Sequence, residues 1–243
     1  MGSQIFKVRH LLPAAFVVLS AAVFGVAQQP SGNKQNARPE STVVEPATRE
    51  TGKNSTRYSY EFTQPQFYVR HILIEHDESG HGRISFIKQN EETPVVEPLE
   101  LSVAATSRLE ALWQALRFLD SEESYQSDRE YPHLGTMRLK MEQGTRKRTA
   151  EFNWTTHKDA LTLVNEYRRA ADQAIWVFDV SVARESQPLN APKLMDQMEL
   201  MLKSNSLSDP KQLIPLLKEL SVDEHIPLMA RNHAARLLKK IDK

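Results

Sequence analysis

The sequence of 243 residues predicts an α+β fold, in which a two-layer antiparallel sheet carries its helices on one face and a small all-helical segment follows. Two observations support this prediction. Two pairs of β-rich segments, each joined by a turn that contains glycine, are each followed by a helix with one apolar stripe, in the order ββαββα. Near residue 187 the pattern changes to leucine-rich helical periodicity, which marks the C-terminal segment.

The first predicted hairpin joins residues 67–76 to residues 84–87. Both segments are rich in β-branched and aromatic residues, and a polar Asp77-Glu78-Ser79-Gly80 turn separates them, so they should pair in antiparallel fashion. The earlier segment is predicted to be an inner strand because apolar residues occupy both of its faces. Those residues are Tyr68, Ile72 and Ile74 on one face and Phe67, Val69 and Leu73 on the other.

Two helices and a second hairpin complete the predicted sheet domain. Ser102 is the predicted N-cap of the first helix, and Thr156, with Asp159 three residues later, resembles a capping box at the start of the second. Between the helices, residues 137–142 and 150–154 alternate apolar and polar side chains around Gly144, which predicts strands with one face in water. The apolar stripes comprise Ala105, Leu109, Leu112, Leu116 and Leu119 in the first helix, and Leu161, Val164, Tyr167, Ala171, Ile175, Phe178 and Val182 in the second.

Three helices are predicted in the tail, residues 185–243. The first carries Leu194, Met198 and Met201, the second starts at Asp209-Pro210, and the third spans residues 227–241. The last two resemble a single HEAT repeat over residues 209–241, with Leu213, Leu216, Leu217, Leu220, Leu237, Leu238 and Ile241 at apolar positions. This resemblance implies a helical packing element and a protein-binding surface, and it brings no catalytic residues. The remainder of the chain resembles uncharacterised exported bacterial proteins, which implies no activity.

A single HEAT-like unit has too few helices to form a solenoid core, because such arrays need about three repeats. The apolar stripes of the tail must therefore be buried against another part of the chain. We expect that cover to be the sheet domain or its long helix.

The N-terminus predicts export. Lys7 and Arg9 precede an uncharged, apolar run over residues 11–27 that ends in Gly25-Val26-Ala27, as in a secretory signal peptide cleaved after residue 27. A retained anchor is less favoured, because the run is interrupted by Pro13 and is shorter than the roughly 20 residues of a membrane span. Residues 28–57 have few apolar side chains and are predicted to be a disordered linker. The sheet domain is then expected over residues 58–184.

Composition excludes several classes of protein. The formal charge is zero, with 31 basic and 31 acidic side chains, so the electrostatic basis for nucleic-acid binding is missing. The absence of cysteine excludes disulfides, thiolate metal sites and cysteine nucleophiles, and in an exported chain it favours a bacterial periplasm or exterior. No dinucleotide, phosphate-loop, nucleophile-elbow or zinc-protease motif occurs, so no cofactor is predicted and an enzyme is the less favoured class.

The first hairpin contains the one candidate metal site, formed by His76, Asp77, Glu78 and His81. A four-residue loop would place the two histidines opposite each other, with both acids nearby as further ligands. A two-residue loop would instead pair Glu78 with His81 and direct His76 away, and a solvated polar turn is the commoner use of such residues. The sequence leaves these alternatives open.

Two other groups of residues are candidates for binding. Arg146, Lys147 and Arg148 follow the turn of the second hairpin and could contact an anion or an acidic partner, although a charge run at a hairpin tip is usually solvated. The three tryptophans lie in segments with apolar stripes and are therefore predicted to pack in the core. They are Trp113, Trp154 and Trp176.

Two functional hypotheses follow from the sequence. The first is an exported, non-catalytic interaction or structural protein of the bacterial envelope, which would bind a protein partner through the helical tail or the open sheet face. The second is a metal-binding protein or metal-dependent enzyme that uses the histidines of the first hairpin.

Overall fold

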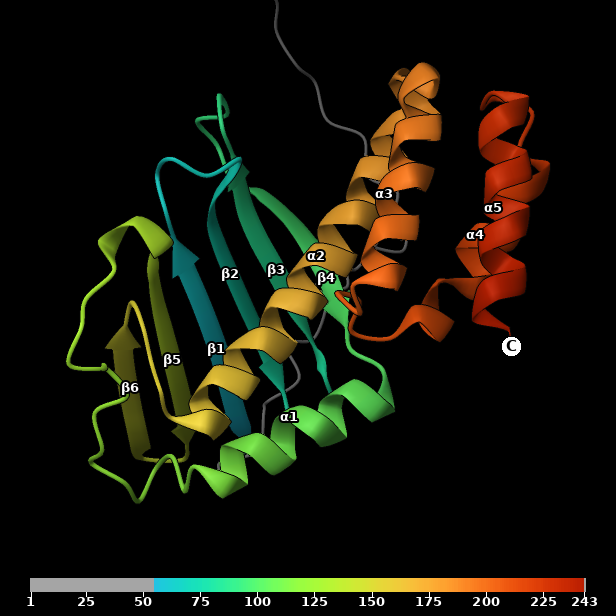
Figure 1. The fold of residues 1–243 in the computed structure, drawn as a ribbon. Helices are drawn as coiled ribbons and strands as arrows, with labels where there is room; N and C mark the ends of the chain where they lie inside the picture. Colours follow the sequence, from blue (N-terminus) through green and yellow to red (C-terminus); the bar gives the residue numbers. More distant parts are fainter. Residues whose placement is uncertain (1–54, 243) are drawn as a thin grey trace, which may run out of the picture. The chain divides into compact units, whose positions relative to one another are not determined.

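The computed structural model describes residues 55–242. Six strands form one antiparallel sheet, and two helices and a helical tail complete the fold (Figure 1). The α+β class predicted from the sequence is confirmed. The predicted signal peptide and residues 28–54 of the predicted linker lie outside the described residues. The linker prediction is wrong for Thr56 and Arg57, which begin the first strand. The strands are β1 (Thr56–Thr63), β2 (Val69–Asp77), β3 (His81–Lys88), β4 (Val95–Glu100), β5 (Thr136–Gln143) and β6 (Arg146–Phe152), in the spatial order β4-β3-β2-β1-β5-β6.

The sheet contains two strands that the sequence analysis missed, so the order ββαββα is corrected to ββββαββα. Strand β1 has buried Tyr58, Tyr60 and Phe62 at alternate positions, and this short alternation directly after the polar N-terminal region was the available signal. Strand β4 is short and contains Pro98, a residue that weakens any strand prediction. Because β4 is an edge strand, it tolerates a proline.

Strand β2 is an inner strand, as predicted, but the physical reason differs. It pairs with β1 on one side and with β3 on the other. Ile72 and Ile74 are buried on the face that the helices cover, whereas Leu73 on the opposite face is only half-buried. The inner position of β2 therefore comes from pairing along the sheet, and one face of the sheet stays open to solvent.

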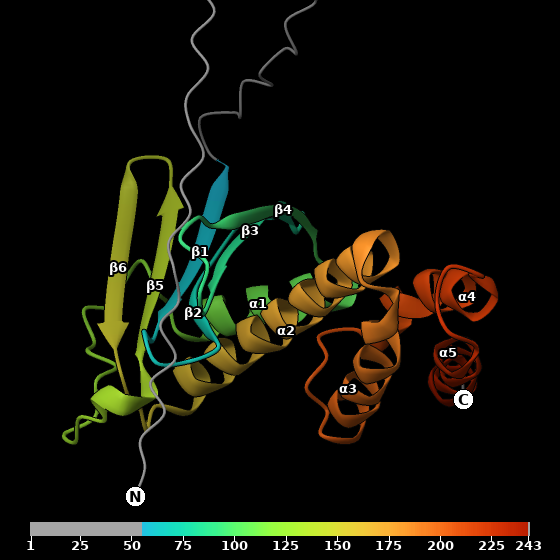
Figure 2. The ribbon, with the colours of Figure 1, turned by 90° about the horizontal axis from the view of Figure 1, so that it is seen from above.

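Helices α1 (Val103–Ala115) and α2 (Lys158–Ser186) lie on the same face of the sheet (Figures 1 and 2). Both pack on neighbouring positions of β1: the Tyr58 ring lies 5.4 Å from Trp113 of α1, and the Tyr60 ring lies 5.1 Å from Tyr167 of α2. The two helices and the covered sheet face enclose the larger of two hydrophobic cores.

The caps of these helices agree with the sequence for α1 and differ for α2. The Ser102 hydroxyl accepts the backbone N–H of Ala105, as predicted, but α1 ends at Ala115, before Leu119 of the expected stripe. The N-cap of α2 is His157, whose ring Nδ1 accepts the backbone N–H of Ala160 at 3.3 Å. The predicted N-cap at Thr156 was one residue early, because the His157 ring nitrogen accepts the hydrogen bond that the Thr156 hydroxyl oxygen was expected to accept.

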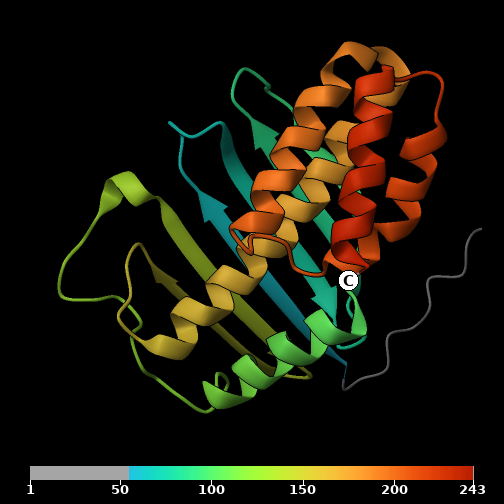
Figure 3. The ribbon, with the colours of Figure 1, turned by 45° about the vertical axis from the view of Figure 1, so that its right-hand side comes forward.

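The tail consists of α3 (Ala191–Lys203), α4 (Ile214–Val222) and α5 (Leu228–Ile241), with short 3₁₀ turns η2 (Pro188–Asn190) and η3 (Pro210–Leu213) before α3 and α4. Its apolar stripes form a second core, and Trp176 and Val180 of α2 belong to that core. Figure 3 shows α2 crossing the sheet and continuing beside α3. The expectation that the long helix covers the tail is confirmed, and the resemblance to a HEAT repeat stays a prediction.

Polar contacts also join the tail to helix α1 and strand β4. Arg108 of α1 donates to the backbone oxygen of Ser208 at 2.7 Å, and Gln212 donates to the backbone oxygen of Glu100 at 2.8 Å. At the far end of α2, Arg184 contacts Asp223 at 2.8 Å. Within residues 55–242, every helix is too short or too polar to cross a membrane.

We expect Trp176→Ala to lower the free energy of unfolding by about 3–5 kcal/mol, because it leaves a cavity where α2 meets the tail. Val177→Ala is the matched control, since Val177 is the next residue on α2 and is exposed. Urea unfolding followed by both tryptophan fluorescence and circular dichroism measures the change. An equal loss in the two variants, or a loss confined to the tail, would contradict a packing role that joins the two cores.

Candidate functional site

The loop of the first hairpin has three residues, so neither of the two expected loop lengths is present. Strand β2 ends at Asp77 and β3 begins at His81, and His76 stands opposite Gly82. Gly80 has φ of 83°, a left-handed conformation that glycine adopts without strain. Because neighbouring positions point to opposite faces of a sheet, this register separates His76 from His81.

His76 points to the covered face and belongs to a buried hydrogen-bond network. Its Nδ1 lies 2.8 Å from the Asp77 backbone oxygen, and its Nε2 lies 2.9 Å from the Tyr167 hydroxyl. That hydroxyl also accepts the Trp113 indole N–H at 2.9 Å. One tautomer satisfies every group: Nδ1–H donates to the carbonyl, and Nε2 accepts the Tyr167 proton. Burial lowers the pKa of His76, against the opposing effect of Asp77, and favours this neutral form.

The other residues of the predicted metal site stay at the exposed tip. Asp77 Oδ1 accepts the backbone N–H groups of Ser79 and His81 and also the Ser79 hydroxyl proton, and these bonds lower the pKa of Asp77 against the effect of burial. Glu78 is exposed. No group of three or more histidine, aspartate or glutamate side chains in residues 55–242 is arranged to hold a metal ion. The hairpin thus separates the side chains that the sequence grouped together.

The tip also contains a chain of serine, histidine and acid. The Ser79 Oγ lies 2.7 Å from His81 Nδ1, and His81 Nε2 lies 3.7 Å from a Glu100 carboxylate oxygen. The Ser79 hydroxyl has one proton, which it donates to Asp77, so His81 must act as the donor toward Ser79. An imidazole in that state cannot take the serine proton, and the three side chains form a solvated turn.

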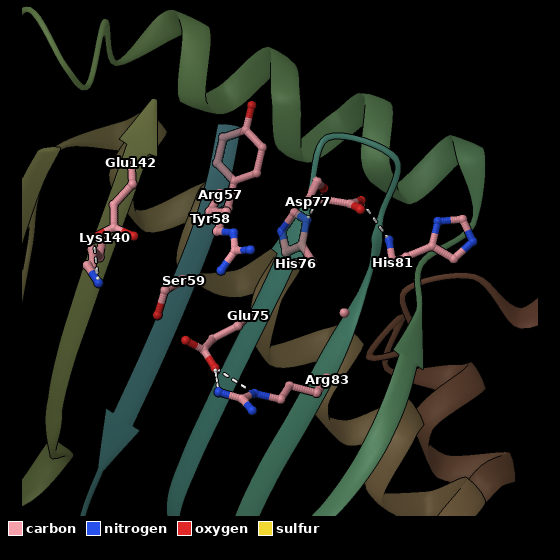
Figure 4. A pocket seen from close by; sticks show the side chains of 11 residues that line it. Arg57, Tyr58, Ser59, Glu75, His76, Asp77, His81, Arg83, Lys140 and Glu142 are labelled. Carbon is pink, nitrogen blue, oxygen red and sulfur yellow. Dashed lines mark hydrogen bonds and ion pairs between the residues drawn. The ribbon is translucent and has the colours of Figure 1, made fainter. Parts of the chain in front are cut away.

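A shallow pocket of about 490 Å³ lies beside this tip, and most of its lining residues come from the open face of the sheet (Figure 4). Its charges are paired, either across neighbouring strands or along one strand. Arg83 contacts Glu75 at 2.6 Å, and Lys140 contacts Glu142 at 2.9 Å. Farther along the same face, Arg138 bridges two glutamates. These charges neutralise one another locally, which leaves little attraction for a charged partner.

The three basic residues of the second hairpin are engaged within the protein. Arg146 forms an ion pair with Asp120, and Lys147 contacts Glu142 at 3.3 Å. Arg148 lies over the Phe118 ring at 4.6 Å and donates to the Phe118 backbone oxygen. The predicted anion contact is therefore occupied by intramolecular partners, which attach the segment after α1 to β6.

A larger concave site lies between the sheet and the N-terminal half of α2, and we call it the aromatic cleft. Its volume of about 750 Å³ falls within the range of small-molecule sites. Three large side chains at its mouth are exposed: Phe67 by 43%, Tyr68 by 65% and Trp154 by 38%. The floor consists mainly of Tyr60, Phe62, Ile72, Met137 and Phe152, and the α2 wall consists of Leu161, Val164, Arg168 and Asp172.

Two amide side chains hold the loops around the aromatic cleft. Gln64, which is buried, donates to the backbone oxygens of Pro132 and His133 at 3.1 and 2.7 Å. The Asn153 side-chain oxygen accepts the backbone N–H of Tyr131 at 3.1 Å. These bonds fix the mouth of the cleft in place, and such preorganisation lowers the entropic cost of binding.

The two charged side chains of the aromatic cleft, Arg168 and Asp172, lie one turn apart on α2. Asp172 is exposed, but the surrounding protein removes enough solvent to raise its pKa to about 6, against the opposing charge of Arg168. Burial likewise raises the pKa of Tyr60 to about 12. An apolar site with a few convergent polar groups and a shifted carboxyl has the character of a ligand-binding site.

The sequence analysis missed the aromatic cleft, and Trp154 shows why. Trp113 and Trp176 are buried as predicted, but Trp154 is partly exposed at the mouth. The prediction extended the strand alternation through Phe152 to Trp154, whereas β6 ends at Phe152. A tryptophan just beyond a strand end, followed by two threonines, was the available signal.

Searches against models of known protein families and against curated proteins give no match to this chain.

Tyr167→Phe should lower the free energy of unfolding by about 2–4 kcal/mol, because it leaves both His76 and Trp113 with buried, unsatisfied nitrogen atoms. Tyr131→Phe is the control, since the Tyr131 hydroxyl makes no hydrogen bond within residues 55–242. Chemical denaturation of the two variants beside the parent protein measures the difference. Equal stability of the two variants would show that the network contributes nothing.

The stabilising contribution of His76 should depend on pH. Because the folded state lowers its pKa below the ordinary 6.5, the folded chain binds this proton less readily than the unfolded chain. The contribution is therefore fully present above pH 6.5 and is lost as the pH falls toward the lowered value. His76→Gln should reduce the fall in stability between pH 7.5 and about 5.5, by up to about 1.4 kcal/mol per pH unit. The control His81→Gln, at the same hairpin, should keep the dependence of the parent protein.

Proposed function

We propose that this chain is an exported, non-catalytic binding module of the bacterial envelope that holds an apolar molecule in the aromatic cleft. One observation carries the proposal: a cleft of about 750 Å³ exposes aromatic side chains at its mouth and contains few polar groups. Exposed aromatic rings around an apolar hollow lose unfavourable contact with water when a ligand covers them.

The tail and the open face of the sheet are weaker candidates for a binding surface than the aromatic cleft. The apolar stripes of the tail are used in the second core, and the charges of the open sheet face are compensated by their neighbours. A protein partner on either surface, which the sequence predicted, has less support than a ligand in the cleft. The zero net charge argues against nucleic acid.

A non-catalytic role and a location outside the cytoplasm complete the proposal. At the first hairpin, the Ser79 hydroxyl donates its proton to Asp77 and so is not activated by His81. The neighbouring His76 is hydrogen-bonded to Tyr167 in the buried network. A metal-dependent function at this hairpin therefore has less support than ligand binding, and no cofactor is proposed. Export rests on the signal-peptide pattern of residues 1–27.

The neutral fluorescent probe N-phenyl-1-naphthylamine should bind saturably, with increased emission. Trp154→Ala and Phe67→Ala should each weaken this binding by about tenfold, the equivalent of about 1.4 kcal/mol of lost apolar contact. Val222→Ala is the control, because Val222 is an exposed apolar residue on α4, outside the cleft. Absence of saturable binding, or equal weakening by the control, would reject the cleft as the binding site.

A further inference from the structure

Arg168 is a charged group in the aromatic cleft that has no acidic partner within ion-pair distance among residues 55–242. Its Nη2 donates to the Met137 sulfur at 3.4 Å, and its guanidinium carbon lies 5.7 Å from the centroid of the Phe62 ring. The same group also acts on the Tyr60 hydroxyl as a hydrogen-bond donor. By contrast, Arg108 and Arg184 each contact a carboxylate, at 3.1 and 2.8 Å. Most of the five N–H donors of Arg168 are therefore available to a ligand.

A second polar group in the same place lacks a regular hydrogen bond. The Tyr60 side chain is fully buried, and its hydroxyl makes no hydrogen bond of regular geometry within the described part of the chain, although the Arg168 side chain lies near enough to act on it as a hydrogen-bond donor. Tyr60 lines the aromatic cleft, and Arg168 and Asp172 are the charged groups that influence its hydroxyl. A buried hydroxyl without a regular hydrogen bond is uncommon and indicates that another group completes the site.

We propose that the ligand of the aromatic cleft is an amphipathic carboxylate, an apolar body with one carboxylate group that binds Arg168 and the Tyr60 hydroxyl. This inference rests on the function proposed above and specifies its ligand. The planar guanidinium matches a carboxylate with two parallel N–H donors, and the tyrosine hydroxyl donates a further hydrogen bond. The apolar body of the ligand then covers the floor of the cleft and the rings at its mouth.

Asp172 helps to decide the sign of the ligand charge. A cationic ligand would be attracted by Asp172 but repelled by Arg168. An anionic ligand would be attracted by Arg168 but repelled by Asp172. Asp172 can lose its charge by taking a proton, whereas an arginine stays charged at every accessible pH. Although Asp172 is exposed, partial loss of solvent to the protein around it raises its pKa to about 6, so its protonation near neutral pH costs little. The permanent charge of the cleft is positive, which favours an anion.

Proton uptake should accompany binding of a carboxylate. The groups that face Asp172 are Arg168 on the same helix and Tyr60 on β1. Among the three side chains, only Asp172 titrates near pH 6. A bound carboxylate raises the pKa of Asp172 further by like-charge repulsion. Affinity for the anion should therefore rise as the pH falls from about 7.5 to about 5.5.

The test compares three ligands that share a ten-carbon chain: decanoate, 1-decanol and decylamine. Titration calorimetry with the chain as it is exported, at pH 7 and below the aggregation limit of each ligand, should show decanoate binding about tenfold more tightly than the other two. Arg168→Gln should remove that preference and leave the affinity for decanol unchanged, and Arg168→Lys should retain part of it. Tyr60→Phe should weaken decanoate binding by a few-fold.

The control is Arg236→Gln, which removes an exposed arginine of α5 and should leave all three affinities unchanged. Asp172→Asn should abolish the rise in decanoate affinity between pH 7.5 and 5.5. Thermal unfolding confirms that each variant is folded.

Several results would overturn the inference. Equal affinities for decanoate and decanol, or an unchanged decanoate affinity in Arg168→Gln, would reject the carboxylate contact while leaving the cleft as a binding site. Tighter binding of decylamine would show that Asp172 selects a cation. If the three ligands fail to bind but the neutral probe still binds, the ligand class alone is wrong; if the probe also fails, the proposed function falls with it.

Discussion

Helix α2 is the element on which the rest of the structure depends, because both hydrophobic cores pack against it. Its 29 residues extend about 43 Å at 1.5 Å per residue. The part from Ala160 to Ile175 packs in the core under the sheet, and Trp176 and Val180 pack in the core of the tail. Neither the sheet nor the tail can shift along α2 without disturbing close-packed contacts in its own core.

The same helix also forms one wall of the aromatic cleft. Leu161, Val164, Arg168 and Asp172 follow at spacings of three and four residues, so they share one helical face. A neighbouring face of α2 carries Leu163 and Tyr167, which are fully buried in the core. The position of the cleft is therefore set by the packing that anchors the helix, which makes it a rigid site.

Two stacked tyrosines show how the core differs from the site. The rings of Tyr60 and Tyr167 lie 5.1 Å apart and nearly parallel. The Tyr167 hydroxyl has both His76 and Trp113 as partners, whereas the Tyr60 hydroxyl has no hydrogen bond of regular geometry within residues 55–242. The satisfied hydroxyl holds the helices on the sheet, and the unsatisfied one is the group to which we propose that a ligand binds.

The sequence by itself determined the fold class, the second hairpin and the helices, because these follow from local periodicity and capping residues. It did not reveal β1 and β4, whose patterns are short or interrupted by proline. Only the tertiary structure decided that a three-residue loop turns His76 inward, and that Trp154 lies at the mouth of a cleft. A one-residue change of register exchanges the two faces of a strand, and no local pattern specifies it. The cleft joins residues from four strands and α2, so its existence depends on contacts between distant parts of the chain.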